Sequence, residues 1–153
     1  MATFWTNRGA RRAIAILFQG ETPPTDFYVA LIKATPAPTV DTTTMAAVAE
    51  ITAGNGYTAG GIQLNRDAVD FDTLNENTTD DLAEALIRDL VWTASGGSIP
   101  ASGAGARYAV LTNDNATLSA REIWLVFDLS SDRTVSVGQA LTLRDLTIQA
   151  TTV

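Results

Sequence analysis

The segment Glu122-Ile-Trp-Leu-Val-Phe-Asp128 places five consecutive apolar side chains, two of them aromatic, between two acidic residues. A run this short and this rich in β-branched and aromatic residues predicts a strand that is buried on both faces. Phe27-Tyr-Val-Ala-Leu-Ile32 has the same character and predicts a central strand, and Arg107-Tyr-Ala-Val-Leu-Thr112 predicts a third. We expect the aromatic residues of the predicted strands, Trp92, Tyr108, Trp124 and Phe127, to lie in a core and not on a ligand platform.

Weaker strand patterns lie between and beyond these segments. Apolar and polar residues alternate over residues 69–72 and 140–151, and shorter strands are expected at 62–65 and 134–137. Residues 82–92 are ambiguous, because leucines at helical spacing lead into Leu90-Val-Trp92, which is typical of a strand. Turn signals recur about every 8–12 residues, as in all-β folds. The predicted fold class is therefore mainly β, an antiparallel β-sandwich or barrel-like domain with an N-terminal α-helix.

The helix is predicted at about residues 8–19. Apolar residues recur there at the spacing of one helical face, after Thr6 or Asn7 as N-cap and before Gly20 as the stop. The members of this stripe are Ala10, Ala13, Ile14, Leu17 and Phe18. A free amphipathic helix of three turns is marginally stable, so the stripe is expected to dock on a sheet.

The chain is expected to form one domain, residues 8–153, preceded by an arm at residues 1–7. The 153 residues and a mean hydropathy of +0.09 suffice for one packed core. Residues 34–44, 75–81 and 95–105 are predicted surface loops, and residues 45–51 one or two helical turns. Three glycines within residues 55–61 predict a turn that needs positive φ or a close approach between chains, leading into the strand at 62–65.

Composition excludes several classes of function. The chain has no cysteine and no histidine, so disulfides, thiolate nucleophiles and Ser-His-Asp or Cys-His catalysis are impossible. We expect no enzyme and no cofactor. The net charge of −7 repels polyanions, so nucleic acid is not an expected partner, and no apolar run reaches the length of about 18 residues that crosses a bilayer, so neither is a membrane.

One cluster of acidic residues is a candidate cation site. Asp67, Asp70 and Asp72, with Asp80 and Asp81 nearby, could supply oxygen ligands, since Asp70 and Asp72 would project from one face of a strand. The alternative is a solvated face of an acidic protein, and it is preferred because no DxDxDG loop is present. No metal site is therefore assigned, and a glycosidase-like carboxylate pair is likewise not favoured.

Several segments together resemble a known group of proteins. They are the Phe27–Ile32 run after a helix and a Gly-Glu-Thr-Pro-Pro turn, then Gly54-Asn-Gly-Tyr-Thr-Ala-Gly-Gly-Ile62, Leu90-Val-Trp-Thr-Ala-Ser95 and Ala106-Arg-Tyr-Ala-Val-Leu111. Their order resembles small virion structural proteins of tailed bacteriophages, the capsid decoration or cement proteins, sometimes labelled tail-fibre proteins. The resemblance spans about residues 17–148 and carries no catalytic signature.

The resemblance implies a function and a partner. It implies a virion protein made in the bacterial host cytoplasm, which binds the outside of the capsid and stabilises the shell by bridging major capsid protein subunits. It implies a homo-oligomer, with a trimer favoured. The alternatives are a tail, neck or fibre structural protein, and a carbohydrate- or calcium-binding β-sandwich module.

The N-terminal arm is the predicted anchor for a partner. Phe4 and Trp5 are costly to leave in water, and Arg8, Arg11 and Arg12 make one basic end on an acidic chain. As a mobile, aromatic-tipped and basic arm, it would reach a neighbouring or capsid subunit. Deleting residues 1 to 7 should then abolish particle binding without unfolding the domain.

Overall fold

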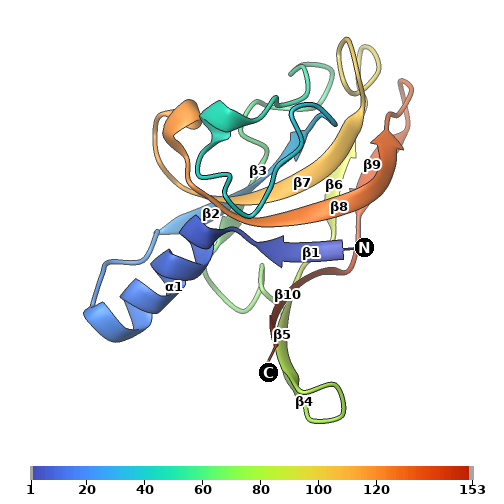
Figure 1. The fold of residues 1–153 in the computed structure, drawn as a ribbon. Coiled ribbons are helices and arrows are strands. Elements are labelled where there is room, and N and C mark those ends of the chain that lie inside the picture. The colour runs from blue at the N-terminus through green and yellow to red at the C-terminus, as the bar shows by residue number, and fades with distance from the viewer. Residues whose placement is uncertain (1, 152–153) are drawn as a thin grey trace.

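The computed structural model describes residues 2–151 and contains one large antiparallel sheet (Figure 1). Within these residues the sheet has five strands, and all of its neighbours pair antiparallel. In spatial order they are β1 (Ala2–Trp5), β8 (Ile123–Arg133), β7 (Ala106–Asn113), β2 (Asp26–Ile32) and β3 (Ile62–Asn65). The three most apolar segments of the sequence thus form the adjacent interior strands β8, β7 and β2.

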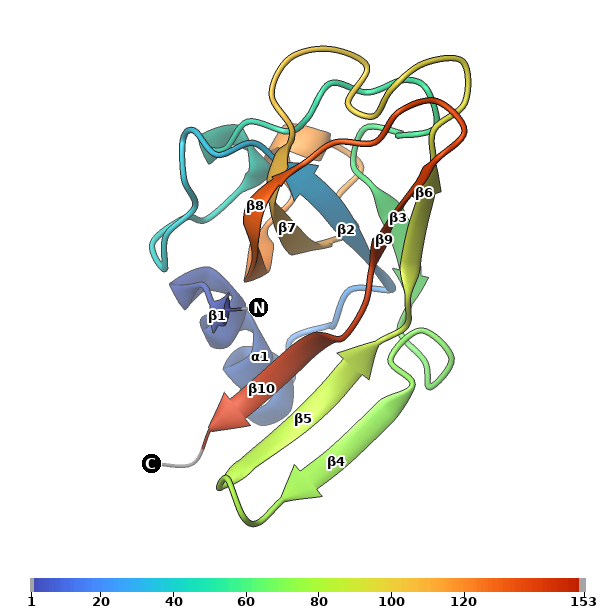
Figure 2. The same ribbon diagram turned by 90° about the vertical axis from the view of Figure 1, so that its right-hand side faces the viewer.

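The second layer is a bent ribbon. Its upper part pairs β6 (Leu90–Thr93) with β9 (Ala140–Leu143), and its lower part pairs β5 (Leu82–Ile87) with both β10 (Leu146–Thr151) and β4 (Thr73–Asn77). Figure 2 shows β5 running into β6 and β9 running into β10, with the β4–β5 hairpin projecting from the body. At the bend Arg144 Nε lies 3.2 Å from Asp89 Oδ2. The fold is mainly β, antiparallel and sandwich-like, with one N-terminal helix, which confirms the predicted fold class.

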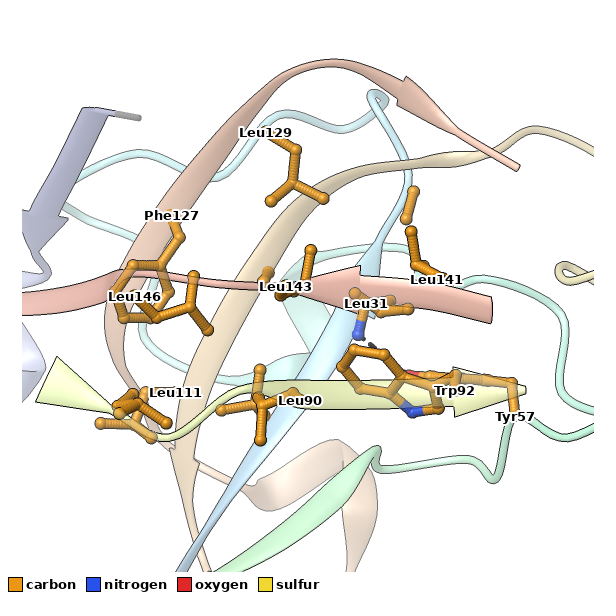
Figure 3. Close-up of a cluster of buried hydrophobic side chains, with 14 of the residues drawn as sticks. Leu31, Tyr57, Leu90, Trp92, Leu111, Phe127, Leu129, Leu141, Leu143 and Leu146 are labelled. Carbon is orange, nitrogen blue, oxygen red and sulfur yellow. Dashed lines mark hydrogen bonds between the residues drawn. The ribbon is translucent and has the colours of Figure 1, made fainter. Parts of the chain in front are cut away.

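The main core lies between the two layers. Figure 3 shows side chains of both layers pointing toward one another, among them Leu31, Leu90, Trp92, Leu143 and Phe127. All five are at most 5% exposed. A smaller cluster on the other face of the five-stranded sheet is closed by the segment around Met45, which begins the short 3-10 helix η1 (Met45–Ala47). A second such helix, η2 (Leu118–Ala120), precedes β8. Of the aromatic residues predicted to lie in a core, Trp92, Trp124 and Phe127 are buried there, and Tyr108 packs against the smaller cluster while only partly buried.

The glycine-rich segment behaves as predicted, because both of the expected constraints are present. Gly56, Gly60 and Gly61 all have positive φ, and β3 begins at Ile62. A Cβ added to Gly61 would lie 1.8 Å from the carbonyl oxygen of Val29 on β2. Glycine is required here for close passage of two backbones as well as for the turn.

Residues 69–81 differ from the prediction. Residues 69–72 form a turn and not a half-exposed strand, and the surface loop predicted at 75–81 contains most of β4. Residues 73–77, polar except for Leu74, form a strand because their backbone pairs with β5 while their side chains mostly face solvent. The ambiguous residues 82–92 are two strands, β5 and β6, separated by Arg88 and Asp89.

Asp70 is buried within that turn instead of projecting beside Asp72. Its Oδ2 accepts hydrogen bonds from Asn65 N at 2.6 Å and Asn65 Nδ2 at 3.0 Å, and its Oδ1 is paired with Arg88 Nε. Burial raises the pKa of Asp70, but the Arg88 and Asn65 hydrogen bonds outweigh burial and hold that pKa below its usual value of 3.8. The carboxylate therefore anchors the turn to the junction of β5 and β6.

We expect this anchor to make stability depend on acid pH. A carboxylate whose pKa is lowered by folding stabilises the protein above pH 3.8, and this contribution is lost as the pH falls below that value. Asp70→Asn should therefore cost about 1–3 kcal/mol near pH 7 and progressively less below about pH 4. Urea unfolding from pH 3 to 7 measures the difference. Asp72→Asn, at an exposed aspartate two residues away, is the control; equal losses in both variants would contradict the assignment.

Candidate interaction surface

The helix α1 (Asn7–Gln19) turns its largest apolar side chains toward solvent. Thr6 Oγ1 caps it by accepting from Gly9 N at 3.0 Å, and Gly20 ends it in the left-handed conformation, as predicted. Ile14, Leu17 and Phe18 are 58%, 75% and 80% exposed. These three residues, at i, i+3 and i+4, form one contiguous surface that we call the α1 patch. The expectation that the stripe docks on a sheet is wrong for these three members.

Small residues hold the opposite side of α1 against the sheet. Gly9 and Ala15 are buried, and Ala13 and Ile16 pack on the main core. A Cβ on Gly9 would lie 2.3 Å from the carbonyl oxygen of Trp124 in β8, so the helix and strand backbones are nearly in contact. No side chain fits between the two backbones at Gly9, and the α1 patch lies on the opposite, outward side of the helix.

Ion pairs fix the same orientation. Arg8 Nη1 lies 3.4 Å from Glu122 Oε1, and Arg12 Nε lies 3.2 Å from Glu122 Oε2, at the start of β8. Arg12 also pairs with Glu21, and Arg11 Nη2 lies 3.5 Å from Glu21 Oε1. Side-chain exposure is 37% for Arg8 and 24% for Arg12 but 60% for Arg11. Arg8 and Arg12 therefore tether α1 to its own chain, and Arg11 is the arginine of this cluster with most surface left for a partner.

The predicted mobile arm is a strand, which corrects that expectation. Ala2 to Trp5 pair with Asp128 to Leu125 of β8, so β1 is an edge of the five-stranded sheet. Phe4 packs on the smaller cluster and Trp5 on the main core, on opposite faces of the sheet. The Trp5 indole also donates to the carbonyl oxygen of Gln149 at 2.8 Å. The two aromatics are half-buried within the domain and do not form a joint tip.

A shallow groove lies beside the α1 patch. It has a volume of about 520 Å³ and is lined by Trp5, Ala10, Ala13, Ile14, Gln149 and Ala150. These residues come from β1, α1 and β10, so the groove joins the helix to the lower part of the ribbon (Figure 1). The α1 patch and this groove share Ile14 and thus form one surface.

A separate exposed apolar residue lies on the β4–β5 hairpin. Leu74 of β4 is 86% exposed, and its row in the sheet continues through Ala85 and Ile148. Ile148 packs against the main core, so only the outer end of this row faces solvent.

Asp67 and Asp70, two of the candidate calcium ligands, bond to nearby groups of their own chain. Asp67 Oδ1 accepts from Val69 N at 2.9 Å and Asp70 N at 3.0 Å, and Asp70 pairs with Arg88. Over residues 2–151, no three acidic side chains gather closely enough to hold a metal ion. In the same residues, none of the helices is long and apolar enough to cross a membrane.

The five residues that the sequence predicts as partner contacts do not include Ile14, Leu17 and Phe18, the exposed apolar residues of α1. Of Phe4, Trp5, Arg8, Arg11 and Arg12, the structure places four largely against their own domain, and their role in partner binding stays a prediction. The helical spacing identifies Ile14, Leu17 and Phe18 as one stripe but predicts that the stripe docks on a sheet. The available signal was Gly9, because a glycine inside a helix indicates close backbone packing on its own side.

No family model, curated protein or solved structure significantly matches this chain.

Proposed function

We propose that this protein is a structural subunit, without a catalytic role, that works by packing into a larger assembly. The observation that carries the proposal is the α1 patch. Covering one large apolar side chain fully is worth about 1.5–3 kcal/mol, and the patch leaves most of three such side chains in water. Contiguous apolar surface on a folded protein commonly marks an interaction site.

The position of the patch supports this interpretation. The helix is held by Gly9 against β8 and by the Arg8 and Arg12 pairs with Glu122, so its outer side is presented on a rigid frame. A rigid surface loses little conformational entropy on binding, which favours association.

We further propose that the assembly is a tailed-phage particle. In this proposal the protein is a capsid decoration protein on the virion exterior that bridges major capsid protein subunits. The support is the resemblance of the Gly54–Ile62, Leu90–Ser95 and Ala106–Leu111 segments to that group. Many copies on one shell would convert modest contact energies into high avidity.

Antibody labelling of intact particles tests the location. On intact phage particles that contain this protein, an antibody against the protein should label the whole capsid surface. Labelling confined to one vertex or to the tail would contradict the decoration assignment and support the tail, neck or fibre alternative. Absence of the protein from purified particles would overturn the phage proposal.

A further inference from the structure

The order of residues along the outer side of α1 is informative. Asn7, Ala10 and Arg11 occupy the N-terminal half, Ile14 the centre, and Leu17 and Phe18 the C-terminal half. Arg8, Arg11 and Arg12 lie in the N-terminal half, whose first turn contains no acidic residue, so these charges are opposite to those that the helix dipole favours at that end. A second helix that runs in the opposite direction would bring its C-terminal end, where the helix dipole is negative, beside these arginines.

We propose that the α1 patch is covered by the α1 patch of a second copy, in an antiparallel pair centred on Ile14. This inference rests on the proposed function, because it takes the patch to be an assembly surface. The pair is isologous, so each helix supplies the same residues to the other.

Antiparallel pairing matches large residues with small ones. When the Ile14 residues of the two copies meet at the centre, residue n of one helix lies at the same level as residue 28 − n of the other. Phe18 is then level with the partner's Ala10, and the shallow groove beside Ala10 and Ala13 receives its ring, while Leu17 is level with the partner's Arg11. A large side chain opposite a small one is the arrangement by which helix ridges fit into grooves.

The same register brings opposite charges together. Phe18 lies level with the partner's Ala10, beside Arg11, where its ring can contact the guanidinium. Glu21 follows the C-cap Gly20, and its N–H donates to Ala15 O at 3.2 Å, a bond that closes the C-terminal end of the helix. In an antiparallel pair this end lies beside the N-terminal half of the partner, so Glu21 of each copy lies on the side of the partner's Arg11. Parallel helices, as around a threefold axis, would instead place Arg11 beside Arg11.

The size of the contact sets the expected affinity. A 13-residue helix is about 20 Å long. Three side chains and the groove bury less than the roughly 800 Å² per partner of a standard interface. We therefore expect a concentration-dependent dimer with a dissociation constant of about micromolar order, strengthened when copies are held on a particle.

Single-cysteine cross-linking tests the register, because the chain has no cysteine of its own. Ile14→Cys should form a disulfide-linked dimer with itself. Leu17→Cys alone should not, because the two sites lie about 9 Å apart along the axis, beyond the Cα separation that a disulfide allows. Phe18→Cys mixed with Ala10→Cys should form the mixed dimer, because these two positions are level in the antiparallel pair. Efficient self-cross-linking of both Leu17→Cys and Asn7→Cys would indicate parallel helices and overturn the proposal.

Sedimentation measures the association itself. The wild-type protein should shift from monomer to dimer with concentration, and Leu17→Arg, which would face the partner's Arg11, should weaken dimerisation at least tenfold without changing the thermal midpoint. Leu74→Arg is the matched control, at a similarly exposed leucine on β4, and should dimerise normally. A wild-type monomer throughout, a trimer, or loss of dimerisation in Leu74→Arg alone would each overturn the pairing. Particle labelling is scored independently, so a labelled particle with a monomeric protein refutes the helix pair and leaves the proposed function standing.

Discussion

Removing residues 1 to 7 is expected to destabilise the protein by about 3–5 kcal/mol, a large share of the roughly 5–15 kcal/mol that stabilises a typical domain. The deletion removes β1 from the edge of the five-stranded sheet and exposes β8. It also removes two half-buried aromatic side chains and the Thr6 cap of α1. This outcome is opposite to that expected of a dispensable arm.

Chemical denaturation of the truncated protein measures the loss, and point variants separate its causes. Phe4→Ala should destabilise the protein because Phe4 packs on the smaller apolar cluster. Phe18→Ala is the control, since it removes the same ring from a site that is 80% exposed, and its effect on unfolding should be within about 0.5 kcal/mol. A truncated protein with wild-type stability would show that β1 is not integral to the fold and would restore the mobile-arm hypothesis.

Replacing Gly61 by alanine is expected to be the most damaging single-methyl change in the glycine-rich segment. At φ +79 the new Cβ is strained by about 1–2 kcal/mol, and it would lie 1.8 Å from Val29 O. Relieving that overlap requires β2 and β3 to separate, which adds about 1–3 kcal/mol. We therefore expect a total loss of about 3 kcal/mol or more.

Gly103 provides a matched control for this prediction. Its φ is +78, and a Cβ added there meets nothing within 4 Å. Gly103→Ala carries the strain of positive φ without the collision, so its urea midpoint should fall much less than that of Gly61→Ala. Equal midpoints in the two variants would show that the close approach to β2 contributes nothing.

Strands made of consecutive apolar residues could be predicted from the sequence. The runs that became β2, β7 and β8 are apolar on both faces because the ribbon covers one face of the sheet and the segment around Met45 covers the other, so their burial was encoded in consecutive residues. The start of β3 followed from the preceding glycines. β4 carried no such signal, because its side chains are exposed and its strand conformation depends on pairing with β5.

For the candidate surface, too, some features follow from neighbouring residues and others depend on the tertiary structure. The bounds of α1 followed from Thr6, the apolar periodicity and Gly20, all local features. Its orientation depends on Gly9 against Trp124 and on Arg8 and Arg12 against Glu122, contacts that join residues more than a hundred positions apart.

The sequence by itself determined that this protein is mainly β, where its helix begins and ends, which strands are buried and which catalytic chemistries its composition excludes. Only the tertiary structure decided that residues 2–5 complete a sheet, that Asp70 bonds to Arg88 and that Ile14, Leu17 and Phe18 face solvent. The physical reason is that periodicity reports which residues share a face, whereas burial of that face depends on what another part of the chain places against it.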